Sequence, residues 1–139
     1  MNYEIRDTYG IYKTNSHNGP GPRLMGADTL LGNDVYNLQN EDIGDIKEIM
    51  LDVASGNVEY AVLSFGSFLG LGEKLFAVPW NALKLDTENK RFLLDVDKER
   101  LKNAPGFDKD NWPDLADKTL ATNLHSYYGT KPYADRLRE

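Results

Sequence analysis

One stretch, residues 42–80, constrains the fold more than any other part of the chain. It holds the densest run of apolar, β-favouring residues and ends in Pro79-Trp80. Within it, residues 57–65 form the clearest strand. Both faces of this strand would be apolar. One face would carry Val58, Tyr60 and Val62, and the other would carry Ala61, Leu63 and Phe65. Such a strand is central in a sheet, or lies in a barrel wall that is covered on its outside.

The preceding segment, residues 43–53, fits two structures. Its apolar residues have the spacing i, i+3, i+7 and i+10, which is typical of a helix, at Ile43, Ile46, Met50 and Val53. As a strand, the segment needs a bulge near Lys47-Glu48, because strict alternation fails. The short turn at residues 55–57 favours a hairpin with the next strand, and we therefore predict a strand.

The remaining strands are shorter. Residues 75–78 predict an apolar strand that Pro79 ends by removing a ladder donor. A polar connection at residues 86–91 joins Leu85 to a segment that contains Phe92, Leu94 and Val96, which predicts a hairpin. Residues 29–31 and 34–38 flank Gly32-Asn33, a pair that suggests a tight turn between two short strands.

Helices are expected only towards the C-terminus. Residues 98–103 predict one or two helical turns. Asp114 is a plausible N-cap for a helix that runs to about residue 128 and stops at Gly129. Its apolar stripe would consist of Ala116, Leu120, Leu124 and Tyr127. At the other end, residues 1–23 read as a flexible arm, since residues 15–23 are rich in Gly, Pro and Asn.

Charge and composition exclude several classes of partner. The formal net charge is −6, and residues 41–65 contain six acidic residues and one basic residue. Phosphate binding relies on clustered Lys and Arg, so we expect no nucleic-acid partner. No apolar run reaches the roughly 20 residues of a membrane span, and no signal peptide is evident, so we expect a cytoplasmic protein without a membrane span. The chain has no cysteine.

The glycine-rich segment, residues 66–74, fails the nucleotide-binding patterns, because its spacing is G-x-x-x-G-x-G-E-K. Its large apolar side chains suggest instead an interaction loop, formed by Phe68, Leu69, Gly70 and Leu71. This loop would contact a protein partner or a second copy of the chain, unless it folds back over the end of a barrel.

No residue pattern predicts a catalytic, cofactor or metal site. Residues 86–90 resemble the start of a calcium loop but place Lys90 where an oxygen ligand belongs. Asp95 and Asp97 would share one face of a strand as a solvated pair. The two histidines, His17 and His125, have no ligand or triad spacing and are expected at the surface or partly packed. Large aromatic residues dominate small cores, so we expect two core anchors, Trp80 and Trp112.

Several local strings resemble one family, the free-standing bacterial PRC-barrel proteins, which are named for the cytoplasmic domain of the photosynthetic reaction centre H subunit. The matching strings are Gly26-Ala27-Asp28, EDIGDI at 41–46, MLD at 50–52, YAVLSFG at 60–66, FLGLGEKLFAVPW at 68–80, LDVD at 94–97, PGFDK at 105–109 and YYGT at 127–130. The resemblance implies a mainly β fold: a small, partly open barrel at residues 24–103, with a C-terminal extension at 104–139 whose helix spans about 114–128. It also implies that residues 43–53 are a strand.

The family shares no catalytic residues, so the resemblance implies a non-catalytic interaction or adaptor module, which we expect to self-associate as a homo-oligomer. An alternative is a small-molecule-binding protein or enzyme that uses the barrel mouth. A further alternative is an RNA- or ribosome-associated factor, because a related barrel forms part of a ribosome maturation factor. The acidic charge argues against this last reading.

Overall fold

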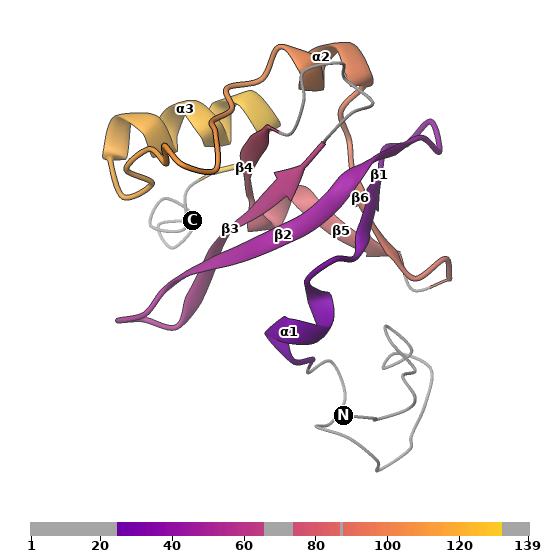
Figure 1. The fold of residues 1–139 in the computed structure, drawn as a ribbon, viewed down its shortest axis with the longest axis horizontal. Coiled ribbons are helices and arrows are strands. Elements are labelled where there is room, and N and C mark those ends of the chain that lie inside the picture. Colours follow the sequence, from indigo (N-terminus) through magenta and orange to yellow (C-terminus); the bar gives the residue numbers. More distant parts are fainter. Residues whose placement is uncertain (1–24, 66–73, 87, 132–139) are drawn as a thin grey trace.

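The structure is a computed structural model that describes residues 25–65, 74–86 and 88–131. It is mainly β, as predicted: six strands form one curled sheet, a half-barrel, with a helix at its C-terminal end (Figure 1). The strands are β1 Asp34–Tyr36, β2 Asp42–Asp52, β3 Asn57–Ser64, β4 Leu75–Pro79, β5 Leu83–Asp86 and β6 Arg91–Leu94. The helices are α1 Ala27–Leu30, the 3₁₀ turn η3 Trp80–Ala82, α2 Lys98–Lys102 and α3 Lys118–Tyr128.

The strand order is β4-β3-β2-β1-β6-β5, and every neighbouring pair is antiparallel except β1 and β6. The two edge strands, β4 and β5, follow each other in the sequence and are joined by η3, which brings the two edges of the curled sheet together. The outer edge of β4 is partly covered, because Leu75 and Phe107 exchange two backbone hydrogen bonds of 2.9 and 2.8 Å.

Residues 43–52 lie in β2 and Val53 begins the following turn, so the strand prediction is confirmed except at its last residue and the helix alternative is wrong. Two irregularities explain the three-residue spacing of Ile43 and Ile46, whereas Met50 packs on a separate cluster and Val53 is exposed. The register with β1 shifts around Ile43, and the register with β3 shifts between Ile46 and Glu48, where the sequence predicted a bulge. Each inserted residue reverses the side-chain parity. As a result Ile43, Ile46 and Ile49, spaced three residues apart, all pack on the same core.

The first irregularity depends on Gly44. Its φ of +139° lies in a region that L side chains rarely adopt. A Cβ at this position would lie 2.4 Å from the Ser64 carbonyl oxygen and 2.6 Å from Cδ1 of Phe65. Only glycine lets β2 pass this close to the end of β3.

The sheet is buried on its inner face and, at β3 and β4, also on its outer face. The inner face of the curl is filled by one apolar cluster, made by Val35, Ile43, Ile46, Ala61, Leu63, Phe65, Phe76, Val78, Phe92, Leu94, Val96, Leu101 and Ala104. A second cluster lies outside, where Leu124 of α3 covers Tyr60 and Ala77. Strand β3 is thus a wall covered from outside, as its two apolar faces predicted.

One element and one boundary differ from the predictions. Residues 29–31 are not a strand: the Thr29 and Leu31 amides donate to the carbonyls of Gly26 and Ala27, which closes the turn of α1. Helix α3 begins three residues later than predicted, because its N-cap is Asp117, which accepts from two backbone amides. Asp114 instead accepts from the Ala116 amide in the preceding turn. The predicted stop is confirmed, since Gly129 is left-handed with φ +76°.

Three side-chain expectations also differ. Asp95 and Asp97 follow β6 rather than lying on it, and Asp97 caps α2 by accepting from the Arg100 amide at 2.7 Å. Trp80 packs against the inner core as predicted, but Trp112 is 40% exposed and is not a core anchor. Its ring contacts Phe107, and its indole N–H donates to the Lys109 carbonyl.

Candidate functional site

A groove with a volume of about 710 Å³ lies outside the curled sheet, between the end of the β2–β3 hairpin and the N-terminal half of α3. Figure 1 shows this hairpin projecting at the lower left, below α3. Apolar residues supplied by both sides line it, namely Met50, Leu51, Tyr60, Leu115 and Ala121. The groove is therefore an apolar surface shared by the sheet and the C-terminal helix.

Strand lengths explain why the hairpin projects. β1 pairs with β2 only as far as Asp45, and β4 pairs with β3 only from Tyr60 onward. The end of the hairpin consequently has no third strand beside it. Leu51 is 45% exposed and Val53 is 88% exposed at this end. Exposed apolar side chains that adjoin an apolar groove are typical of binding surfaces.

The charged groups of the groove differ in how they are engaged. The Asp52 carboxylate shapes the hairpin turn by accepting from the Ala54 amide at 3.1 Å and from the Ser55 hydroxyl at 3.0 Å. Glu59 stands on the strand wall and Lys118 on the helix wall. Within the described residues, neither of these two side chains takes part in an ion pair or hydrogen bond. Both charges remain available to a ligand.

His125 and Tyr60 form the inner wall of the groove. His125 is only 3% exposed, so the expectation of a surface or partly packed side chain is wrong. Its Nδ1 lies 2.8 Å from the Thr130 hydroxyl, and its ring centroid lies 5.9 Å from that of Tyr60. Burial raises the pKa of Tyr60, and the nearby Glu59 carboxylate adds to the rise. The Tyr60 phenol therefore stays protonated at neutral pH and can serve in hydrogen bonding but not as a base.

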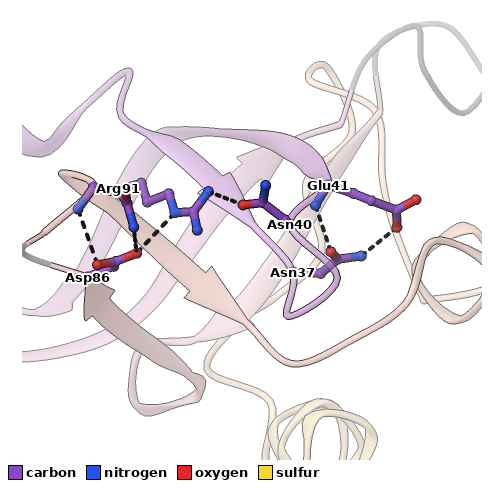
Figure 2. A network of polar contacts seen from close by, with 6 residues as sticks. Asn37, Asn40, Glu41, Asp86 and Arg91 are labelled. Carbon is purple, nitrogen blue, oxygen red and sulfur yellow. Dashed lines mark hydrogen bonds and ion pairs between the residues drawn. The ribbon is translucent and has the colours of Figure 1, made fainter.

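A second polar cluster lies elsewhere, between the β1–β2 turn and the β5–β6 hairpin (Figure 2). Arg91 donates to Asp86 at 3.1 Å and to the Asn40 side chain at 2.7 Å, and its guanidinium covers the Tyr36 ring at 4.3 Å. Hydrogen bonds from Asn89 hold the pKa of Asp86 below its usual range, and Arg91 contributes to the same shift.

The other half of Figure 2 is the turn around Asn37, whose side chain is buried. Its carboxamide oxygen accepts from the amides of Gln39 and Glu41, and its nitrogen donates to the Glu41 carboxylate at 2.8 Å. The bonds of Asn37 close the β1–β2 turn, and the bond from Arg91 to Asn40 joins this turn to the β5–β6 hairpin. We interpret the cluster as a structural joint rather than a binding site.

The interaction loop predicted from the sequence, Phe68, Leu69, Gly70 and Leu71, lies outside the described residues and stays a prediction, as does the N-terminal arm with His17. Among residues 25–65, 74–86 and 88–131, no group of three or more acidic or histidine side chains is placed to hold a metal ion. None of the helices in these ranges is both long and apolar enough to cross a bilayer.

The comparison with known families separates the six-stranded sheet from helix α3. No curated protein matches the sequence. The model of the PRC-barrel domain matches residues 22–101, more than half of the chain. This range contains all six strands together with α1 and most of α2, whereas α3 lies beyond it. The groove is thus formed where the family's domain meets the C-terminal helix of this chain. The protein belongs to the PRC-barrel domain family.

Proposed function

We propose that this protein is a non-catalytic interaction module that binds a protein partner in the groove between the β2–β3 hairpin and α3. The observation that carries the proposal is the exposure of two apolar side chains of the hairpin, Leu51, which lines the groove, and Val53, which follows in the turn. Fully burying an aliphatic side chain contributes about 1.5–3 kcal/mol. A partner that covers these two side chains would gain roughly 2–3 kcal/mol, or about 30- to 150-fold in affinity.

The chemistry of the groove supports binding rather than catalysis. Asp52 is engaged in the hairpin turn, Nδ1 of His125 is held by Thr130, and burial keeps the Tyr60 phenol protonated. The remaining charges, Glu59 and Lys118, stand on opposite walls. Groups placed in this way can orient a bound segment through ion pairs.

Capture from the native host tests the proposal. The full chain is compared with the double variant Leu51→Asp, Val53→Asp, and proteins lost in the variant are identified by mass spectrometry, purified and titrated calorimetrically. Leu38→Asp is the matched control, because Leu38 is also exposed, at 58%, but lies in the β1–β2 turn. We expect the double variant to lose at least tenfold in affinity and the control to keep it. Equal binding by all three proteins would contradict the proposal.

Self-association is a separate part of the proposal and uses the loop at residues 68–71. An apolar loop of this composition supports a homotypic contact, and light scattering on Phe68→Asp and Leu71→Asp tests it. We expect the wild type to have an oligomer mass that both variants reduce to the monomer mass. A wild type that is monomeric at high concentration would refute this part alone.

A second candidate function is the binding of a small molecule in the same groove, outside the half-barrel rather than at its mouth. The volume of about 710 Å³ lies within the usual range of ligand sites, about 300–1,000 Å³. A thermal-shift screen with metabolites tests this function, because a ligand at a hundredfold excess over its Kd stabilises the folded state by about 2.7 kcal/mol. A stabilisation that Leu51→Asp abolishes would favour a small ligand over a protein.

A further inference from the structure

We propose that the groove binds a mixed-charge amphipathic helix, with basic side chains along one edge of its apolar stripe and acidic side chains along the other. The inference rests on the proposed function and names the chemistry of the partner. Its basis is the distribution of charge over the lining residues: an acidic strand wall and a basic helix wall stand on either side of an apolar floor, made by Met50, Leu51, Tyr60, Leu115 and Ala121.

The two walls differ in sign. Among the described residues that line the groove, the charged ones are Asp52 and Glu59 of the hairpin and Lys118 of α3. The Asp52 carboxylate is already used in the hairpin turn. Glu59 and Lys118 take part in no ion pair or hydrogen bond within the described part of the chain. The groove therefore offers a carboxylate on one side and an ammonium group on the other.

A partner segment must carry both signs to use both groups. A uniformly basic segment attracts Glu59 but repels Lys118, and a uniformly acidic segment does the reverse. A segment with one basic and one acidic edge gains two attractions. An exposed ion pair is worth about 1.4- to 5-fold in affinity, and replacing one attraction by a repulsion doubles this effect in free energy. We therefore expect a mixed segment to bind about 2- to 25-fold more tightly than a uniform one.

The shape of the groove favours a helical segment. The α3 residues that line it are Lys118, Ala121 and His125, which form one stripe over two helical turns, a rise of about 10 Å. A helix whose apolar stripe covers the floor and Leu51 carries its flanking residues on two sides, one beside each wall. In an extended segment, successive side chains point to opposite faces, so charges would not flank an apolar stripe in this way.

Three blocked twelve-residue peptides with the same leucine stripe at helical spacing test the inference by calorimetric titration of the full chain. The flanks are lysine on one edge and glutamate on the other in the first peptide, all lysine in the second and all glutamate in the third. The salt concentration is about 0.15 M, because the net charge of −6 attracts any cationic peptide at low salt. We expect the first peptide to bind with a micromolar Kd and the other two at least threefold more weakly.

Charge reversal on the protein is the decisive comparison, because the three peptides differ in helicity. Glu59→Lys makes both walls basic, so the all-glutamate peptide should then bind most tightly. Lys118→Glu makes both walls acidic, so the all-lysine peptide should then bind most tightly. Glu88→Lys, on the exposed β5–β6 turn, changes the net charge as Glu59→Lys does and should leave the order of the peptides unchanged. Loss of folding would weaken all three peptides and would not exchange their order.

Several results would overturn the inference. One is no binding of the mixed peptide, and another is an order of affinities that neither Glu59→Lys nor Lys118→Glu changes. An equal change of order in Glu88→Lys would show nonspecific attraction. A dimer of the full chain that Leu51→Asp dissociates would identify a second copy as the occupant instead.

These outcomes are separate from those of the proposed function. If the full chain captures a protein through Leu51 and Val53 but does not bind the mixed peptide in preference to the uniform ones, the interaction module stands and the mixed-charge partner is wrong. If no captured protein depends on these two residues, the module itself fails.

Discussion

Gly44→Ala tests the register of β2 most sharply. The added Cβ would lie 2.4 Å from the backbone oxygen of Ser64 and 2.6 Å from the Phe65 ring, and neither can move without displacing the end of β3. Positive φ costs a non-glycine residue about 1–2 kcal/mol, and overpacking a closed site costs about 1–3 kcal/mol more. We therefore expect a loss of about 2–5 kcal/mol, a large fraction of the 5–15 kcal/mol that is typical of a folded domain.

Gly56→Ala is the matched control, because Gly56 has a φ of +83° in the hairpin turn but nothing lies within 4 Å of an added Cβ. It should lose only the backbone part, about 1–2 kcal/mol. Urea unfolding followed by circular dichroism measures both variants, provided that the slope m is unchanged. Equal losses in the two variants would refute the close approach of β2 to Ser64, and with it the bulge that directs Ile43 and Ile46 inwards.

Three further predictions concern single polar groups. The Tyr128 hydroxyl is enclosed without a hydrogen-bond partner within the described residues, so Tyr128→Phe should raise the free energy of unfolding by about 1 kcal/mol; a decrease would show that the hydroxyl is satisfied. Asp117→Ala should cost about 1 kcal/mol in urea unfolding by removing the α3 cap, and Asp114→Ala should cost less. The pKa of Asp86 is lower in the folded state than in the unfolded chain, where it is about 3.9. The Asp86 carboxylate therefore contributes fully to stability above the unfolded pKa, and this contribution is lost as the pH falls through the lower folded pKa. The stability difference between the wild type and Asp86→Asn should therefore shrink between pH 5 and pH 2; a constant difference would contradict the assigned shift.

The sequence predicts the sheet better than the groove. The two apolar faces of residues 57–65 identify a covered wall, and the failed alternation at Lys47-Glu48 marks a bulge. Such signals are local, because strand parity and turn residues act over a few positions. The N-cap of α3 was misplaced for a local reason too: Asp114 and Asp117 are both good caps, and only the hydrogen bonds distinguish them.

The groove could not be predicted from any single segment of the sequence. It exists because α3 packs across β3 and β4 while the hairpin extends past the last paired residue of β1. The burial of His125 and the exposure of Trp112 depend on the same long-range packing. One signal in the sequence could have pointed to the proposed binding surface, namely two large apolar residues, Leu51 and Val53, beside the polar turn at residues 54–57.

The proposed binding surface is tested most directly by titrating a purified host partner into the full chain, the double variant Leu51→Asp, Val53→Asp, and Leu38→Asp. If the groove binds the partner, the double variant loses at least tenfold in affinity while Leu38→Asp binds like the wild type. Unchanged affinity in the double variant, with an unchanged urea midpoint, would place the interaction elsewhere on the molecule.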